Sequence, residues 1–506
     1  MTSILFGLFG LAVLLAIVWA FSNNKSAVNW KLVGTGIGLQ IGFAACVLLG
    51  SNFVDWIAGG ADGKAQPEEI RTWVRTIMWL GGIGIALIAL AWWRTQLARR
   101  DLVMRVGLIL AGAATALALP FADTAFDALG DGFVTLLEYV KAGSGFIFGS
   151  LMDIDKFGFI FAFQVLPTII FFAALMGVLY HLGVMQAVVR VMALAITKVM
   201  KVSGAETTSV CASVFIGQTE APLTVRPYIS RMTESELLTM MIGGMAHIAG
   251  GVLAAYVGML SNNDPVQGVF YAKHLLAASI MAAPATLVIA KILIPETGEP
   301  LTRGTVKMEV EKTTSNIIDA AAAGAGDGLR LALNIGAMLL AFIALIALLN
   351  GILGWIGGLQ VCGADGCFSI NGALGAPLSL QLVLGYVLAP IAWLIGVPWS
   401  DANLVGGLIG QKIVLNEFVA YLQLADIVNG KVPGVALSDQ GKLIATYALC
   451  GFANFSSIAI QIGGIGGLAP ERRADLARFG LRAVLGGSIA TLMTATIAGV
   501  LTSLGG

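Results

Sequence analysis

Charged side chains are scarce in this sequence. Only 11% of its 506 residues are Asp, Glu, Lys or Arg, whereas about a quarter of the residues of a soluble domain are charged. Hydrophobic residues make up 58% of the chain, and the mean hydropathy is +0.88. So few charges cannot cover a water-soluble particle of this size, and so much apolar surface excludes an intrinsically disordered chain. We therefore expect a polytopic membrane protein.

Net charge and cysteine are lacking as well. The 29 Lys and Arg residues balance 29 Asp and Glu residues, so the chain has none of the excess positive charge typical of nucleic-acid-binding proteins. Five cysteines in 506 residues exclude a disulfide-rich secreted scaffold. The sequence also contains neither the Gly-X-Ser-X-Gly nor the His-Glu-X-X-His motif of hydrolases. We therefore expect no enzyme, no organic cofactor and no nucleic-acid partner.

Long apolar stretches follow one another along the chain. A helix needs roughly 20 apolar residues to cross a bilayer core about 30 Å thick, so the sequence predicts an all-α fold with about ten transmembrane helices. The first stretch lacks the basic leader and the small-residue cleavage site of a signal peptide, and we therefore count it as a span. The predicted spans are Ser3–Phe21, Val33–Val54, Trp73–Trp93, Leu102–Leu119, Phe157–Val184, Leu237–Leu260, His274–Ile294, Leu329–Ile356, Leu443–Ile462 and Val484–Leu504.

Two further apolar segments, Val189–Tyr228 and Leu380–Leu424, are interrupted by Gly, Pro and polar residues. We interpret each as a re-entrant hairpin, which enters and leaves the membrane on the same side. The even number of crossings then places both termini on one side. Roughly two thirds of the 29 Lys and Arg residues fall on the opposite side, which the positive-inside rule assigns to the cytoplasm. We expect both termini on the external side of the inner (plasma) membrane.

Two cysteines, Cys362 and Cys367, fall in the loop Val361–Phe368, which this topology places outside the cell. In an oxidising compartment they can close a small disulfide, and the alternative is a pair of free thiols. The sequence leaves both alternatives open.

Two glutamates lie where charge is costly. An ionisable side chain inside the bilayer marks a candidate functional site. Most charges of the chain lie near helix ends, but Glu220 and Glu417 lie inside the two broken hairpins. Gly217 and Pro222 flank Glu220 and predict a backbone that is not helical there.

The order hairpin, helix, helix occurs twice. Each hairpin is followed by a helix with polar residues at its middle, within Ala246–Val252 and Gly451–Ser457. A helix and the polar linker Pro295–Ser315 separate the two copies and reverse their direction through the membrane. Inverted repeats with broken helices are typical of secondary transporters that bind their solute near the membrane midplane. Irregular backbone at that depth has to be buried or to line a cavity.

Three motifs lie on these broken elements. They are Gly-Gln-Thr-Glu-Ala-Pro-Leu-Thr-Val-Arg-Pro-Tyr at Gly217–Tyr228, Asn-Glu-Phe-Val-Ala-Tyr at Asn416–Tyr421, and Cys-Gly-Phe-Ala-Asn-Phe-Ser-Ser-Ile at Cys450–Ile458. Together they resemble the motifs of the concentrative nucleoside transporter family. The resemblance covers the first two helices and most of the chain from about Phe157 onward, whereas Gly59–Ala118 has no counterpart in the short bacterial members. It implies a homotrimer that moves nucleosides across the bilayer by an elevator motion.

The resemblance also implies a fixed scaffold domain and a mobile transport domain. In chain order, the predicted units are N-terminal scaffold helices (1–58), an inserted helical pair (59–118), an interfacial helix with a scaffold helix (119–188), the first transport repeat (189–294), a linker with a long scaffold helix (295–360) and the second transport repeat (361–506).

The two halves of a nucleoside are assigned by the same resemblance. Residues that would bind the nucleobase are Gln218, Thr219, Glu220, Val252 and Phe452, and residues that would bind the ribose are Glu417, Asn454 and Ser457. A carboxylate accepts charge-assisted hydrogen bonds from two hydroxyls, and a Gln amide answers both the donors and the acceptors of a uracil edge. The structural alternatives are buried acids paired with helix ends, polar groups that satisfy a broken helix, and apolar core residues.

The sequence departs from the family at the coupling cation. Sodium-coupled members carry an Asn five residues before the Gln of the first motif and a Ser in the next helix. The matching residues here are Ser213 and His247, beside the carbonyls of Ile216 and Ile248. A hard cation prefers oxygen ligands to imidazole, while histidine exchanges protons near neutral pH. We therefore expect proton coupling through His247 or the hairpin glutamates. The alternative is a packing histidine, with sodium bound by carbonyls and water.

We expect nucleosides such as uridine as the substrates, and a symporter for another small polar solute is the alternative function. An ion channel would favour a continuous polar pore helix in each subunit, which paired broken hairpins do not provide. We interpret Lys412 and Arg330 as structural residues. The preference for purine or pyrimidine nucleosides remains open at this point.

Overall fold

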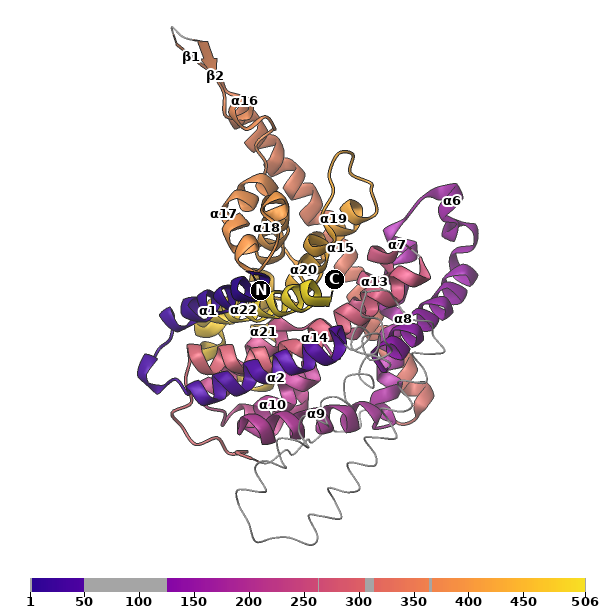
Figure 1. Cartoon of the computed structure of the whole chain (residues 1–506). Coiled ribbons are helices and arrows are strands. Elements are labelled where there is room, and N and C mark those ends of the chain that lie inside the picture. The colour runs from indigo at the N-terminus through magenta and orange to yellow at the C-terminus, as the bar shows by residue number, and fades with distance from the viewer. Residues whose placement is uncertain (1, 50–124, 263, 305–313, 364–365, 506) are drawn as a thin grey trace, which may run out of the picture.

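Figure 1 shows the computed structural model of the chain. The predicted inserted pair, residues 59–118, lies outside the part that is described, and so do its spans Trp73–Trp93 and Leu102–Leu119. The structure describes residues 2–49, 125–262, 264–304, 314–363 and 366–505.

Six helices of the described part are long and apolar enough to cross a membrane, and a seventh span forms if one bent pair is counted as a unit. Because a helix satisfies its own backbone hydrogen bonds, it can cross the hydrocarbon core without stranded polar groups. The predicted class, an all-α polytopic membrane protein, is confirmed. The six are Trp30–Leu48, Phe161–His181, Glu234–Ser261, Pro265–Leu293, Ile317–Gly358 and Pro470–Ser503.

These helices divide into an inner and an outer group. In Glu234–Ser261, Pro265–Leu293 and Pro470–Ser503, 83 to 89% of the residues in the most apolar stretch are buried inside the protein. In the other three helices the buried share is 17 to 28%, so their apolar side chains are available to lipid or to another chain. The inner helices form the core that carries the broken elements.

The two ends of the chain lie at the same end of the helical bundle (Figure 1). Helix α1 (Thr2–Ala20) packs antiparallel on α22 (Arg473–Gly505), with Gly7 against Val500. Helix α2 packs on α14 and α22. The placement of the termini agrees with an even number of crossings.

Several shorter elements lead to the first hairpin. Helix α8 packs along the length of the later helix α15. The elements are η1 (Lys25–Ala27), α2 (Trp30–Leu48), a helix over 125–148, η2 (Gly149–Met152), α6 (Ile154–Phe157), α7 (Phe161–Gln164), α8 (Leu166–His181) and α9 (Val184–Met200).

The first re-entrant hairpin is shorter than the predicted segment Val189–Tyr228. That segment begins inside α9, which ends where Lys201 adopts a left-handed conformation. Residues 214–220, which include the start of the first motif, are not helical and form the tip of the hairpin. Its arms are α10 (Gly204–Ser213) on one side, and η3 (Ala221–Val225) with α11 (Arg226–Ile229) on the other.

The second predicted hairpin, Leu380–Leu424, contains two changes of direction. Helices α17 and α18 are bent by 117° relative to each other at a turn where Gly396 has φ +103°, a conformation that favours glycine. The chain breaks again at Leu415–Asn416. The pair that matches the first hairpin in chain order is therefore α18 with α19, and α17 matches α9. The bounds are α16 (Ile370–Leu374), α17 (Leu380–Leu394), α18 (Trp399–Val414) and α19 (Glu417–Val428).

Both helices that follow the hairpins are interrupted, at residues 247–249 and 449–454. The predicted span Leu443–Ile462 is therefore two helices. The polar residues expected at the middle of these helices lie instead in gaps, where backbone groups are free to bind a ligand. The elements are α12 (Glu234–Ala246), α13 (Gly250–Ser261), α14 (Pro265–Leu293), α20 (Asp439–Ala448), α21 (Phe455–Leu468) and η4 (Pro470–Arg472).

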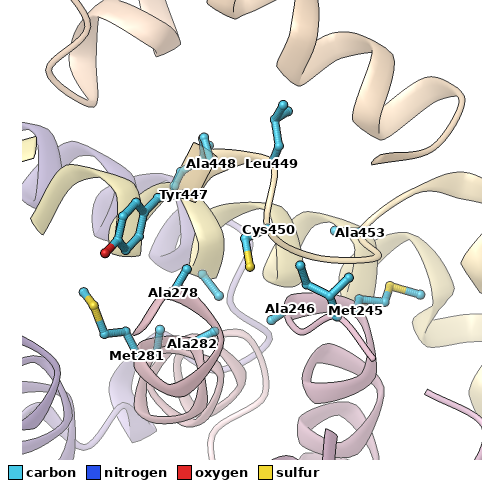
Figure 2. Close-up of a cluster of buried hydrophobic side chains, with 14 of the residues drawn as sticks. Met245, Ala246, Ala278, Met281, Ala282, Tyr447, Ala448, Leu449, Cys450 and Ala453 are labelled. Carbon is cyan, nitrogen blue, oxygen red and sulfur yellow. The ribbon is translucent and has the colours of Figure 1, made fainter. Parts of the chain in front are cut away.

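The two interruptions cross at the centre of the protein. Met245 and Ala246, labelled in Figure 2, lie against the backbone of Gly451. A Cβ on Gly451 would lie 2.9 Å from the Met245 carbonyl oxygen, so only glycine permits this approach. The Phe452 amide donates to the His247 carbonyl at 3.3 Å. Because of this crossing, a displacement of one interruption would directly shift the other.

The repeats also interlock through their last helices. Helix α12 packs on α22, and α14 packs on α20, so the broken helix of each repeat lies on the last helix of the other. The small side chains Ala278 and Ala282 of α14 face Tyr447 and Cys450 (Figure 2). The Cys450 thiol donates to the Leu275 carbonyl at 3.9 Å. These contacts hold the second interruption against the first repeat.

A buried ionic cluster fixes the base of the first hairpin. The Lys291 ammonium lies 2.8 Å from the Glu206 carboxylate and 3.1 Å from that of Glu296. The Ser203 hydroxyl donates to Glu236 at 2.5 Å. These contacts join the starts of α10 and α12 to the end of α14, so the hairpin and the inner helices form one packed unit.

The long helix α15 (Ile317–Gly358) extends beyond the rest of the chain and leads into an antiparallel hairpin (Figure 1). The hairpin consists of β1 (Val361–Gly363) and β2 (Gly366–Phe368). Cys362 is disulfide-bonded, and the register of the strands places it opposite Cys367. Of the two alternatives that the sequence leaves open, the bonded state of Cys362 excludes the pair of free thiols.

Candidate substrate-binding site

A cavity of about 1380 Å³ lies between the two repeats and is bordered by α8 and α15. Its wall includes both hairpin breaks and both helix interruptions. All eight residues that the sequence assigns to a nucleoside line this one cavity, although they come from four separate stretches of chain. They are Gln218, Thr219, Glu220, Val252, Glu417, Phe452, Asn454 and Ser457.

Glu417 is the most buried acid of this wall, with 5% of its surface exposed. It is the first residue of α19, whose start is capped by Asn416 through a bond from the Val419 amide at 2.9 Å. The Tyr256 hydroxyl donates to Glu417 Oε1 at 3.1 Å, and Asn454 Nδ2 donates to Oε2 at 3.0 Å. Each carboxylate oxygen thus has one protein donor and a further lone pair for a ligand.

Asn454 joins helix capping to this carboxylate. Its Oδ1 accepts from the Ser457 amide at 2.9 Å and from the Ser456 hydroxyl at 2.7 Å, which is the ordinary N-cap role of asparagine. With the oxygen used for the cap, Nδ2 faces Glu417. The start of α21 therefore fixes the direction of the Asn454 amide.

Gln218 is connected to the second repeat by a chain of hydrogen bonds. Its Nε2 donates to the Ser457 hydroxyl at 3.1 Å, and its Oε1 accepts from Gln461 Nε2 at 3.1 Å. The same Gln461 nitrogen donates to the Met241 carbonyl at 2.9 Å. The nucleobase and ribose residues predicted from separate motifs are thus parts of one polar network.

Thr219 and Glu220 form the tip of the first hairpin. The Thr219 hydroxyl donates to Glu220 Oε1 at 2.8 Å. Gly217 leaves room for this arrangement, because a Cβ there would collide with the Glu220 carboxylate. Unlike Glu417, Glu220 is exposed and lines the cavity, so its carboxylate is open to solute and water.

An apolar wall faces these polar groups. Val252 is buried at the start of α13, and Phe452 is half-buried in the second interruption. Ile335 and Leu339 of α15 line the same cavity. An aromatic ring with aliphatic neighbours provides the flat apolar surface on which a planar ring can pack.

The four candidates for the coupling cation lie near the contact between the first hairpin and the first interruption. There the Gly250 amide donates to the Phe215 carbonyl at 2.9 Å. One of the candidates lines the cavity and the other three are buried away from it: these are Ile216 in the wall, and Ser213, His247 and Ile248 behind it.

His247 has a distinctive hydrogen-bonding pattern. Its Nδ1 lies 2.6 Å from the Gly243 carbonyl, and because a carbonyl only accepts, we assign the ring proton to Nδ1. Its Nε2 is buried and has no hydrogen-bond partner among the described residues. The Ser213 hydroxyl donates to the Ser209 carbonyl at 3.0 Å, which leaves its lone pairs free. The His247 imidazole can therefore still accept a proton, and the Ser213 oxygen can still coordinate a cation.

Two residues of the site were missed by sequence reasoning. Tyr256 holds Glu417, and Gln461 holds Gln218. A Gln within the apolar run after the third motif could have pointed to Gln461, because an amide in a membrane helix needs polar partners. A tyrosine in an apolar helix carries no comparable signal.

The chemistry of the cavity fits a neutral solute with two unlike ends. Glu417 and its neighbours offer acceptors for hydroxyl groups, while Gln218, Glu220 and the Phe452 ring line the same cavity. The cavity thus offers a solute both directional hydrogen bonds and a flat apolar surface.

Comparisons with known proteins agree on one family. Residues 9–64 match the model described as the N-terminus of the Na+ dependent nucleoside transporter. Residues 162–263 match a nucleoside recognition model, and residues 274–499 match the C-terminus of the Na+ dependent nucleoside transporter. These matches include all three motifs.

Whole-length relatives point the same way. An uncharacterized transporter of Haemophilus influenzae is 45% identical, with 99% of each chain covered. Nucleoside permease NupC of Helicobacter pylori is 40% identical, again with 99% of each chain covered. The mouse sodium/nucleoside cotransporter 1 is 41% identical over 74% of this chain and 56% of its own.

Solved structures of the transporter CNTnw share the fold. An inward-facing, substrate-bound state matches with a TM-score of 0.72 and 38% identity, covering 99% of this chain and 98% of that one. A doubly substituted variant in an outward-facing state matches with a TM-score of 0.74, 38% identity and 99% of each chain. The chain belongs to the concentrative nucleoside transporter family, as the motifs predict, and is a membrane transporter of nucleosides.

Proposed function

We propose that the protein is a secondary active importer that couples the uptake of nucleosides such as uridine to a cation gradient. The convergence of eight residues from both repeats on one cavity carries the proposal. A site shared by two interlocked repeats can be opened to either side of the membrane when they move as a unit.

The ribose is bound at the buried end of the cavity. The free lone pairs of Glu417 accept hydrogen bonds from two neighbouring hydroxyls of the sugar. Asn454 and Ser457 lie next to Glu417 in the same network and take the remaining hydroxyl contacts. A deoxy sugar or a free base leaves these groups unpaired, and that is costly in a buried site.

The nucleobase is bound between the first hairpin and the second interruption. Phe452 and Val252 pack on its faces, and Gln218, Thr219 and Glu220 meet its polar edge directly or through water. The exposed carboxylate of Glu220 suits a contact through water, because water reaches it in the open cavity.

For the coupling ion, we propose a proton carried at His247, with the hairpin glutamates as further carriers. The Nε2 of this buried imidazole, which has no partner among the described residues, can take up a proton, and the position of His247 in the first interruption ties its charge to the binding site. Protonation changes the hydrogen bonding of the 247–249 gap. This gap leads directly into α13, which carries Val252 near its start.

Sodium is the alternative coupling ion. The family description and the name of the mouse relative both include sodium. The Ser213 hydroxyl and the carbonyls of Ile216 and Ile248 are oxygen donors of the kind that a hard cation prefers. His247 then only packs against Gly243.

The transport step is proposed to be an elevator motion within a homotrimer in the plasma membrane. The inner helices and hairpins would form the transport domain, and α8 and α15 the scaffold. Two observations support this division. The inner helices are mutually buried, and one side of α15 carries exposed apolar residues such as Leu345 and Leu348, which a lipid or a neighbouring copy can cover.

Uptake of labelled uridine into proteoliposomes tests the proposed function. Glu417→Gln and Asn454→Ala should each lower the uptake efficiency at least about tenfold, the value of one hydrogen bond to a charged group. Glu299→Gln is the matched control, because Glu299 is exposed and outside the cavity. Full uptake by both site variants would end the site assignment, and saturation by a different polar solute alone would favour the alternative function.

Separate gradients decide the coupling ion. A pH gradient at constant sodium should stimulate uptake in the wild type. His247→Gln should abolish this stimulation but should still exchange labelled for unlabelled uridine across the membrane in the absence of a gradient. Stimulation by a sodium gradient at constant pH, with none by a pH gradient, would replace the proton by sodium.

A further inference from the structure

Gln461 lies outside the cavity wall but touches a residue of that wall. It is fully buried, with 0% of its surface exposed, and its amide contacts Gln218 and the backbone of Met241. Gly244 makes room for this contact, because a Cβ there would lie 2.7 Å from Gln461 Nε2 and 2.9 Å from Gln218 Cβ. The three elements α12, α21 and the hairpin tip thus meet at one buried amide.

The direction of the Gln461 amide is fixed by chemistry. A backbone carbonyl only accepts hydrogen bonds, so the group that lies 2.9 Å from the Met241 oxygen must be the Gln461 nitrogen. The second hydrogen of that nitrogen is directed to Gln218, 3.1 Å away. The Gln218 atom that faces it must then be an acceptor, which is Oε1.

The direction of the Gln218 amide follows from this. With Oε1 held by Gln461, Nε2 lies on the side of Ser457. Ser457 does not impose a direction, because a hydroxyl can either donate or accept. The order of donor and acceptor on Gln218 is therefore set by Met241 through Gln461, and one N–H and one lone pair remain for a ligand.

We propose that Gln461 is a positioning residue that locks the Gln218 amide in one direction and thereby sets which nucleobase edge the transporter accepts. The proposal rests on the proposed nucleobase role of Gln218. Uracil and cytosine differ in the groups that matter: uracil has a carbonyl at C4 and an N–H at N3, whereas cytosine has an amino group at C4 and a bare N3. A locked amide satisfies one of these two patterns, whereas an amide that can turn over satisfies both.

The test is a comparison of uridine and cytidine uptake in proteoliposomes. The wild type should discriminate between the two nucleosides in kcat/KM. In Gln461→Leu the Gln218 amide is released. The ratio of kcat/KM for the preferred nucleoside to kcat/KM for the other should then fall by about three- to tenfold, the value of one neutral hydrogen bond. A residue with only a structural role would lower both efficiencies by the same factor and leave the ratio unchanged.

Gln461→Glu is the stronger variant, because its neutral carboxyl group can donate to Met241 and presents an oxygen to Gln218. The Gln218 amide must then turn over to donate, so the preference between uridine and cytidine should reverse. Both variants are first checked for a melting temperature in detergent close to that of the wild type. Since one variant releases the amide and the other inverts it, failure of either to fold leaves the other as a test.

Gln411→Leu is the matched control. Gln411 is another buried glutamine that donates to a backbone carbonyl, that of Gly407, and to a second glutamine, Gln423, but it does not line the cavity. The ratio of uridine to cytidine kcat/KM in Gln411→Leu should equal that of the wild type. An unchanged ratio in both Gln461 variants, or a wild-type ratio of one, would overturn the proposal for Gln461 alone. A wild type that takes up neither nucleoside would overturn the proposed function and this proposal with it.

Discussion

Glu417 illustrates how single residues prepare this site before a solute arrives. Its two oxygens are already held by Tyr256 and Asn454, and Asn454 is itself fixed by capping α21. Side chains held by such second contacts lose little further entropy when they bind a ligand. The proposed ribose end is therefore held in place, while the exposed Glu220 leaves the proposed base end more adaptable.

Tyr256→Phe tests this preparation. The substitution removes the hydroxyl that orients Glu417, so we expect the KM for uridine to rise about tenfold, from a loss of about 1 to 2 kcal/mol. Tyr421→Phe is the control, because the Tyr421 ring stacks on that of Tyr256 at 4.2 Å while its hydroxyl donates to the Thr446 carbonyl. Uptake kinetics of both variants are compared. An equal KM in both would mean that Tyr256 only packs.

At this scale the sequence predicts residue types better than their partners. The eight proposed binding residues could be named from three motifs, and one cavity contains them all. Tyr256 and Gln461 could not be named, because their importance arises from contacts between positions 161 and 243 residues apart. Such contacts depend on how the repeats cross, which a motif does not encode.

Among the elements, the two crossed interruptions determine where the site lies. Gly451 permits the crossing, since its backbone lies against that of Met245. Gly451→Ala should therefore push the interruptions apart and strongly reduce the uptake of every nucleoside, without a change in preference. Gly463→Ala is the control, because a Cβ at Gly463 of α21 has open space around it. Wild-type uptake by Gly451→Ala would show that the crossing tolerates displacement.

Lys412 of α18 holds the end of α20, where the second interruption begins. Its buried ammonium group donates to the Ala448 carbonyl, at the end of α20, and to the Thr491 hydroxyl of α22, both at 2.8 Å. A cation at a helix C-terminus is favourable, because the freed carbonyls there are partly negative. The sequence interpretation of Lys412 as a structural residue is consistent with these contacts.

Lys412→Met should lower the stability of the protein. The free energy of unfolding should fall by about 1 to 3 kcal/mol, because the Ala448 carbonyl loses a buried partner. The measurement is the thermal unfolding temperature in detergent. Lys442→Met on α20 is the control, since Lys442 pairs with the exposed Asp439. A melting temperature equal to that of the control would contradict the proposed support.

The elements themselves are predicted unevenly by the sequence. Apolar length identifies α14 and α15, because a long apolar run has few alternatives in a membrane. The gap after α20 and the turn between α17 and α18 are not visible in hydropathy, since Gly396 and Cys450 are apolar or neutral. At these two places the apolar run continues across the break, and only the packing shows where the helices stop.

For the molecule as a whole, the contact between α8 and the inner helices is where the proposed domains meet. Gly251 of α13 approaches Phe172 of α8, with 3.5 Å from its Cβ position to the Phe172 Cβ. Within the proposed scaffold, Gly328 of α15 approaches Ala173 of α8 even more closely, and a Cβ on Gly328 would lie 2.8 Å from the Ala173 Cβ. The looser contact between Gly251 and Phe172 allows the elevator proposal to be tested by cross-linking.

A disulfide between Gly251→Cys and Phe172→Cys should stop uridine uptake, because it ties the transport domain to the scaffold. The Cβ spacing suits a disulfide, and a reducing agent should restore uptake. Uptake is measured before and after reduction, with the single-cysteine variants as controls. Continued transport by the cross-linked pair would contradict a sliding motion at this interface.

The helix breaks also determine the electrical character of the site. Helix α19 begins at Glu417, and α21 begins just after Asn454, so the partly positive starts of two helices point towards the Glu417 carboxylate. The peptide dipoles and two neutral donors thereby balance this carboxylate, and the solute is not required to bring a positive charge. Because the carboxylate is already stabilised in this way, a cationic solute gains little by pairing with it. An uncharged sugar is therefore the better occupant. A membrane protein with so few charges can therefore select for neutrality by means of its backbone.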